Sequence, residues 1–204
     1  MQVRPISRSA LIDELAERLI SETGRIRVAI DGAEALDPGA LAEDVADALR
    51  NRGRYVIHVR TDDFLLPASQ RFEFGRMSPE SFYDGWWDER GLQREVLDPA
   101  VTTGRVLPAL WRADIDRSAR ADYVTLPETA VLFLSGQFLL GGGLPFETVV
   151  RLTASGKALE RRTPPDRAWT LPAYERYDEE VAPDSFADIV VRLEDPRHPA
   201  VIEA

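Results

Sequence analysis

The stretch from Arg27 to Gly53 constrains the fold most strongly, because a short apolar run, a glycine and an amphipathic pattern follow one another directly. Residues 27–30 read RVAI, and Gly32 comes two residues later. Apolar side chains then recur at helical spacing, at Leu41, Ala42, Val45, Ala46 and Leu49. This order predicts a buried strand, a tight turn and a helix that packs one face against a sheet.

Further strands alternate with helices along the chain, which is typical of a parallel sheet covered by helices on both faces. A first helix presents Leu11, Ile12, Leu15, Leu19 and Ile20 on one face, with Ser9 as its candidate N-cap. A helix over residues 40–50 lies between the first two strands. The predicted strands span residues 27–30, 55–59, 130–134, 148–152 and 189–193. We therefore expect an α/β fold in one domain over residues 1–204, since this length supports a single substantial core.

The turn after the first strand has the frame of a phosphate-binding loop, GxxxxGK[ST], but not its chemical groups. Counting from Gly32 places Asp37 at the second glycine, Pro38 at the lysine and Gly39 at the hydroxyl residue. In a working loop the lysine bridges phosphates and the hydroxyl binds Mg²⁺. Asp37 followed by Pro38 instead suits a helix start, with Asp37 as N-cap. The turn is either an ordinary capped turn or an unusual phosphate cradle.

Composition excludes several classes of function. A formal net charge of −10 argues against nucleic-acid binding, which needs a basic face. The chain has no Cys and only His58 and His198, too few for a His-based zinc site. Acidic residues interrupt the N-terminal apolar pattern, so neither a signal peptide nor a membrane span is expected there. We expect a cytoplasmic protein.

Several segments, in order, carry a resemblance: RVAIDG, TDDF after the second strand, GRMSPESFYDGWWD, VLFLSGQFLL and the closing ADIVVRLEDPRHP. Together they resemble the uridine kinase-like branch of the P-loop nucleoside kinase and phosphoribulokinase family. The resemblance covers nearly the whole chain. It implies a three-layer α/β fold with a five-stranded parallel sheet. It also implies transfer of the γ-phosphoryl group of a nucleoside triphosphate to a hydroxyl of a nucleoside or related molecule.

The acceptor side of such a site matches better than the donor side. The resemblance implies that Asp62 is the candidate catalytic base, if the protein is active. Residues 61–127 would form an acceptor-side insert, whose aromatic rings either stack on a ligand or anchor the segment to the sheet. The candidate pocket residues besides Asp62 are Asp63, Phe64, Arg76, Tyr83, Trp86, Trp87 and Arg112.

On the donor side, the resemblance implies an acidic residue at the end of the third strand, where this chain has Ser135. Without that acid and the loop hydroxyl, no Mg²⁺ site is evident and no metal is expected. A lid-like segment at residues 154–172 carries Arg161, Arg162 and Arg167. These arginines would be the cations nearest to a bound triphosphate, or simply a charged helix end.

Three functions remain open from the sequence. The first is a uridine kinase-like protein that has lost phosphoryl transfer, needs no cofactor and binds a small, nucleoside-like molecule or a protein partner. The second is an active kinase or nucleoside triphosphate hydrolase with a non-standard loop, which would need ATP and Mg²⁺. The third is a structural subunit that pairs with an active paralogue in an oligomer.

Overall fold

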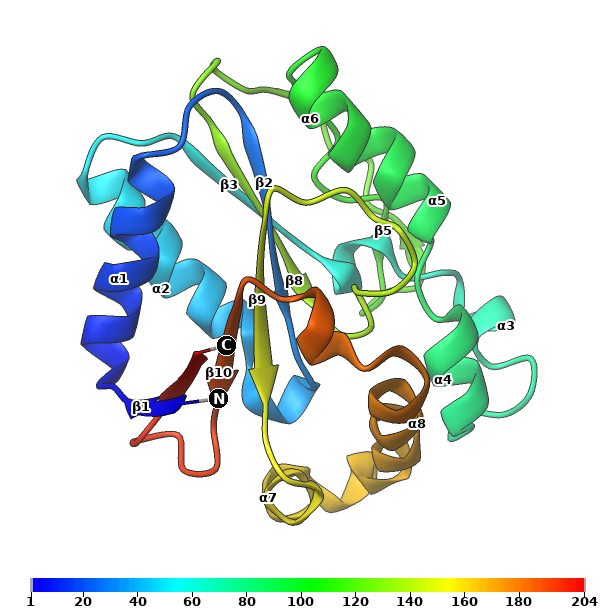
Figure 1. The fold of residues 1–204 in the computed structure, drawn as a ribbon. Coiled ribbons are helices and arrows are strands. Elements are labelled where there is room, and N and C mark those ends of the chain that lie inside the picture. The colour runs from blue at the N-terminus through cyan, green and yellow to red at the C-terminus, as the bar shows by residue number, and fades with distance from the viewer. Residues whose placement is uncertain (1, 204) are drawn as a thin grey trace.

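A seven-stranded sheet runs through the centre of the computed structural model, which describes residues 2–203 (Figure 1). Its order is β1-β11-β10-β9-β2-β8-β3. The five strands from β10 to β3 are parallel to one another. This confirms the predicted five-stranded parallel sheet, with observed bounds β2 (Ile26–Asp31), β3 (Val56–Arg60), β8 (Val131–Gly136), β9 (Thr148–Thr153) and β10 (Ile189–Arg192).

Two antiparallel strands extend the sheet beyond β10, and neither was predicted. Strand β11 (Ala200–Glu203) pairs with β10, and β1 (Gln2–Pro5) pairs with β11. In the register, Ile202 lies between Val190 on one side and Val3 on the other. The two ends of the described chain therefore lie side by side, as Figure 1 shows.

Helices cover both faces of the sheet and make three layers (Figure 1). One face carries α1 (Arg8–Ile20) and α2 (Pro38–Asn51); the other carries α5 (Glu89–Leu92), a π-helical turn η3 (Gln93–Leu97) and α6 (Asp98–Thr102). Alternate strand residues supply the two cores, since successive side chains of a strand point to opposite faces. On β8, Phe133 joins the α1/α2 side, whereas Leu132 and Leu134 join the other.

The cap of α1 differs from the prediction. Ser7, not Ser9, is the N-cap, because the Ser7 hydroxyl accepts a hydrogen bond from the Ala10 N–H at 3.2 Å. The helix therefore begins at Arg8, one turn before the predicted apolar stripe. For α2 the prediction is confirmed: Asp37 is the N-cap and Pro38 is the first helical residue.

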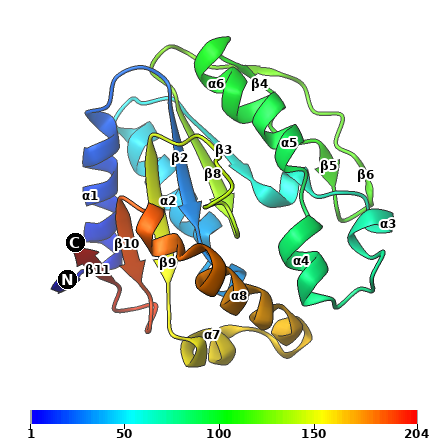
Figure 2. The same ribbon diagram turned by 45° about the vertical axis from the view of Figure 1, so that its right-hand side comes forward.

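Residues 61–127 fold into short elements, which explains their weak periodicity. They comprise η2 (Thr61–Phe64), α3 (Ala68–Arg71), α4 (Pro79–Gly85), the α5–α6 stretch and two small sheets, β4 (Arg105–Val106) with β7 (Val124–Thr125) and β5 (Trp111–Arg112) with β6 (Arg117–Ser118). In the turned view of Figure 2, α4 faces α8 (Leu171–Val181) beyond the ends of the strands. No helix among residues 2–203 has the length and apolar character needed to cross a bilayer.

A buried ion pair fixes the end of β2 to β9. Arg151 donates to Asp31 at 2.7 Å, and Tyr177 of α8 and the Leu139 N–H also donate to this carboxylate. Asp31 is fully buried. Burial raises the pKa of the Asp31 carboxyl, while Arg151 opposes that shift. The strand end that leads into the candidate loop is thus held on three sides.

Candidate functional site

Four backbone N–H groups of the turn between β2 and α2 donate hydrogen bonds to other groups of the protein. The Gly32 N–H donates to the Gly136 carbonyl at 3.0 Å, and the Glu34 N–H donates to the Tyr174 hydroxyl at 3.2 Å. Within the short turn η1 (Glu34–Leu36), the N–H groups of residues 36 and 37 donate to the carbonyls of residues 33 and 34. A phosphate cradle needs such donors free and convergent, and four of them are engaged here.

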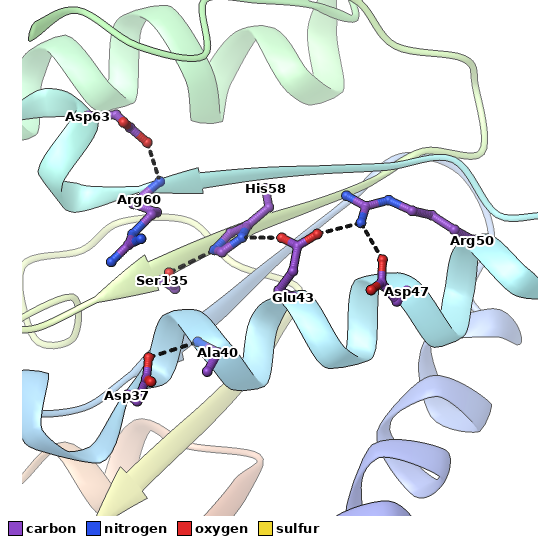
Figure 3. A network of polar contacts seen from close by, with 9 residues as sticks. All are labelled: Asp37, Ala40, Glu43, Asp47, Arg50, His58, Arg60, Asp63 and Ser135. Carbon is purple, nitrogen blue, oxygen red and sulfur yellow. Dashed lines mark hydrogen bonds and ion pairs between the residues drawn. The ribbon is translucent and has the colours of Figure 1, made fainter. Parts of the chain in front are cut away.

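Asp37 occupies the start of α2 with its own carboxylate. Its Oδ1 accepts from the Ala40 N–H at 3.0 Å, as Figure 3 shows. Asp37 adopts the left-handed region, with φ 54° and ψ 60°, which Asp tolerates better than most residues. The negative charge that a helix N-terminus favours is therefore supplied from within the chain.

The two glycines of the turn have different surroundings. A Cβ on Gly32 would lie 2.9 Å from the Leu152 Cβ, so Gly32 allows close packing against β9. A Cβ on Gly39 would lie 3.6 Å from the Arg60 guanidinium carbon. Arg60, at the end of β3, thus lies over the first turn of α2 and brings a cation near the position where the loop motif has its lysine.

Ser135 belongs to a chain of hydrogen bonds that joins β8, β3 and α2 (Figure 3). The Ser135 hydroxyl lies 2.8 Å from Nε2 of His58, and Nδ1 of His58 lies 3.0 Å from the Glu43 carboxylate. Arg50 donates to the other oxygen of Glu43 at 2.6 Å. Hydrogen bonds from Arg50 and then from His58 lower the pKa of Glu43. The side chain at the third-strand position is tied into the fold.

The order Ser135, His58, Glu43 resembles that of a hydrolase triad, but the serine is not accessible enough for that role. Ser135 is only 2% exposed. The cavity beside it measures about 60 Å³ and is also lined by Asp37, Gly39 and Asp62. A space of this size holds little more than water. These hydrogen bonds therefore have a structural role and link β8, β3 and α2.

Mg²⁺ and a triphosphate do not fit this donor side. Four turn N–H groups are engaged, three carboxylates line the small cavity, and the third-strand residue is a serine whose hydroxyl is hydrogen-bonded to His58. Within residues 2–203, no group of three or more His, Cys, Asp or Glu side chains is arranged to hold a metal ion.

A larger cavity of about 350 Å³, which we call the acceptor-side cavity, adjoins the donor side. Its walls are polar and aromatic, and its volume lies in the range of small-molecule binding sites. Its lining residues are Glu34, Asp62, Leu65, Arg71, Phe82, Trp86, Ala113, Gln137 and Arg167. Asp62 lines both cavities and so stands between them.

The surroundings of Asp62 raise the pKa of its carboxyl group. Its side chain is 59% exposed, yet it sits in a recess where desolvation raises its pKa. Glu34 adds to that rise, whereas Arg60 and Arg167 oppose it. Arg60 lies 3.9 Å away. The candidate base is thus placed where an acceptor hydroxyl would reach it.

Of the three lid arginines, only Arg167 enters the acceptor-side cavity. It lies on η4 (Pro165–Thr170) and donates to Glu34 through Nε at 3.1 Å and through Nη2. Arg161 and Arg162, on α7 (Gly156–Arg162), donate to the carbonyls of residues 194 and 193. These two bonds hold α7 to the end of the last parallel strand.

The aromatic residues both pack together and line cavities. Phe82 is buried at the centre of a ring cluster, with centroids 5.0 Å from Trp86, 5.3 Å from Phe138 and 5.5 Å from Trp169. Trp86 also lines a neighbouring cavity of about 320 Å³, together with Tyr83 and Trp87. The rings therefore anchor the segment by packing on one another, and some of them also line cavities.

Four of the predicted pocket residues lie outside these two cavities. Asp63 accepts from the Arg60 N–H at 3.1 Å, and Phe64 is fully buried in the core. Arg76 stacks over Phe72 at 5.4 Å, and Arg112 pairs with Asp114 at 2.7 Å on the β5–β6 hairpin. The sequence analysis missed Arg71, Glu34 and Gln137 as lining residues.

Comparisons with known proteins give structural neighbours only. No protein-family model and no curated protein matches the chain. A possible uridine kinase from Bacillus stearothermophilus has a TM-score of 0.74 at 22% identity, over 89% of this chain and 97% of that one. A provisional fructose transport system kinase from Silicibacter sp. TM1040 has a TM-score of 0.63 at 25% identity, over 85% and 89%.

The chain has the fold of the P-loop kinases. A D-glycerate 3-kinase from Cryptococcus neoformans is a further neighbour, with a TM-score of 0.54 at 15% identity over 85% of this chain and 80% of that one. At these identities the likeness establishes the kinase fold and leaves the reaction open. It confirms the resemblance seen in the sequence at the level of the fold.

The capping role of Asp37 can be tested by substitution. We predict that Asp37→Ala lowers the free energy of unfolding by about 1 to 2 kcal/mol, because the cap is lost and Ala is disfavoured in the left-handed region. Asp37→Asn retains both features and should stay close to wild type. Urea denaturation measures the difference. Equal stability of the two variants would contradict the role given to this carboxylate.

Proposed function

We propose that this protein is a uridine kinase-like, cytoplasmic protein that has lost ATP-dependent phosphoryl transfer. In this proposal it acts as a ligand-binding module and holds a small hydroxylated molecule in the acceptor-side cavity. The proposal rests mainly on one observation: four N–H groups of the turn are bonded to carbonyls or to the Tyr174 hydroxyl, and the Asp37 carboxylate caps the helix start.

The charges near the donor cavity support the same proposal. Glu34, Asp37 and Asp62 all line that cavity of about 60 Å³. A carboxylate about 5 Å from a phosphate charge costs roughly 3 kcal/mol at an effective dielectric of 20, and less where exposed. The attraction of a helix N-terminus is worth about 1 kcal/mol. Repulsion from an unpaired carboxylate at that distance would exceed this attraction; Arg167 pairs with Glu34 and Arg60 lies near Asp62, which reduces the repulsion.

The acceptor side supports retained binding. Its cavity combines two carboxylates, two arginines and two largely buried aromatic residues, Phe82 and Trp86, so it offers both polar and apolar contacts. The neighbouring structures are named for uridine, fructose transport and D-glycerate, all of which concern hydroxylated molecules. We take a hydroxylated molecule as the ligand class on that ground.

An active enzyme with a non-standard loop is the second candidate, because two arginines flank Asp62. Arg60 lies 3.9 Å from Asp62, and Arg167 lines the same cavity. In that case one of them would replace the loop lysine, and the Arg167–Glu34 pair would have to open. Asp62 would then orient the acceptor hydroxyl.

Isothermal titration with ATP and GTP, each with and without Mg²⁺, separates the two candidates. We predict no Mg-dependent binding of either triphosphate at protein concentrations that detect micromolar affinity, because the donors are engaged. Micromolar Mg-dependent binding would overturn the proposal and favour the active enzyme. Asp62→Asn would then be the control in a phosphoryl-transfer assay.

Restoring the loop tests where the defect lies. We predict that Asp37→Gly, Pro38→Lys and Gly39→Thr, combined with Ser135→Asp, raise nucleotide affinity at least tenfold, about 1.4 kcal/mol. Glycine suits the left-handed backbone at position 37. Calorimetry with Mg-ATP measures the change against wild type. A restored variant that binds no better would show that the pocket is closed elsewhere.

A further inference from the structure

Arg71 is a buried arginine without a counter-ion among the described residues. The residue is only 6% exposed, and it lines the acceptor-side cavity. Its Nε donates to the Leu66 carbonyl at 2.7 Å. Within residues 2–203 it forms no ion pair, which is unusual because buried charges are normally paired.

The guanidinium of Arg71 is held in place before any ligand arrives. It lies over the ring of Phe72 at 4.8 Å and over the ring of Trp86 at 5.3 Å. Together with the bond to Leu66, these rings fix the plane of the group and leave its terminal nitrogens as donors. A fixed planar fork binds carboxylate or phosphate in a bidentate manner at little entropic cost.

The nearby carboxylates are committed elsewhere. Asp116 accepts from the Ala68 N–H at 2.8 Å and from Trp111 Nε1 at 3.1 Å, and Glu34 is bonded to Arg167. Asp62 and Asp116 act on Arg71 only at longer range, and burial lowers the pKa of Arg71. The cation is thus desolvated but not neutralised.

Trp86 adds a second unsatisfied donor to the same region. Its ring nitrogen is buried and has no hydrogen-bond partner among the described residues, and the residue lines the cavity beside Arg71. Buried donors of this kind usually have a partner. An oxygen-rich group in the cavity would pair with the guanidinium of Arg71.

We propose that Arg71 makes the acceptor-side cavity a site for small anionic polyols. The ligand carries a carboxylate or phosphate group bound by Arg71, and a hydroxyl group that reaches Asp62. This inference rests on the proposed function, because it names the ligand class of the same cavity.

The test compares matched pairs of compounds that differ in one anionic group. The pairs are glycerate and glycerol, ribose 5-phosphate and ribose, and uridine 5′-monophosphate and uridine, each titrated calorimetrically into the wild-type protein. We expect the charged member of at least one pair to bind at least tenfold more tightly than its neutral partner. The carboxylate and phosphate arms show which anion is preferred.

The variant Arg71→Gln should remove that preference, so that the charged and neutral members of each pair bind with similar affinity. Arg76→Gln is the matched control, because Arg76 stacks over the same Phe72 ring but lies outside the cavity. It should keep the wild-type preference. If Arg71→Gln does not fold, the wild-type comparison of the three pairs still decides.

Each outcome separates this inference from the proposed function. Neutral compounds that bind as tightly as the charged ones in every pair would overturn the anion site but leave a ligand-binding cavity. A preference that survives in Arg71→Gln would also overturn it. Failure of all six compounds to bind would count against both the anion site and the ligand-binding role.

Discussion

The bond between the Asp37 carboxylate and the first turn of α2 is the interaction on which the rest of the site depends. A helix N-terminus after a buried parallel strand attracts negative charge, and this is the physical basis of phosphate loops. In this chain the Asp37 carboxylate supplies that charge and accepts a hydrogen bond from the Ala40 N–H. Because the helix start is capped by Asp37, the neighbouring N–H groups of the turn can bond to other groups of the protein. A nucleotide phosphate would have to displace both the Asp37 cap and the hydrogen bonds of the turn.

The two halves of the site have consequently diverged in character. On the donor side, Ser135, His58, Glu43 and Arg50 form a hydrogen-bonded chain that links β8 and β3 to α2, and the third-strand residue carries no charge. On the acceptor side, an open cavity contains an arginine that is buried and unpaired in the described part of the chain. Natural folds tolerate such a charge mainly where function requires it. The chain has the fold of the P-loop kinases, and Trp86, whose buried ring N–H has no hydrogen-bond partner in the described part of the chain, lines the acceptor-side cavity.

The sequence predicted the elements whose signals are local and missed the features that depend on distant residues. The five parallel strands and the Asp37–Pro38 helix start follow from apolar runs and capping chemistry, and the structure has them. Strands β1 and β11 span four residues each and pair across the two ends of the chain, so no local pattern announces them. Arg71 looks like a surface arginine in sequence. Its burial depends on how Phe72 and Trp86 pack around it, which periodicity does not encode.

Hydrogen–deuterium exchange tests the central claim, a closed donor turn beside a working acceptor cavity, within one experiment. The backbone amides are followed in the free protein, with Mg-ATP, and with the tightest-binding compound of the matched pairs. The account predicts protection by that compound in residues 62–86 and 165–170, and no change at residues 32–42 with Mg-ATP. Protection of residues 32–42 by Mg-ATP would contradict it, because the turn would then be a functioning phosphate site.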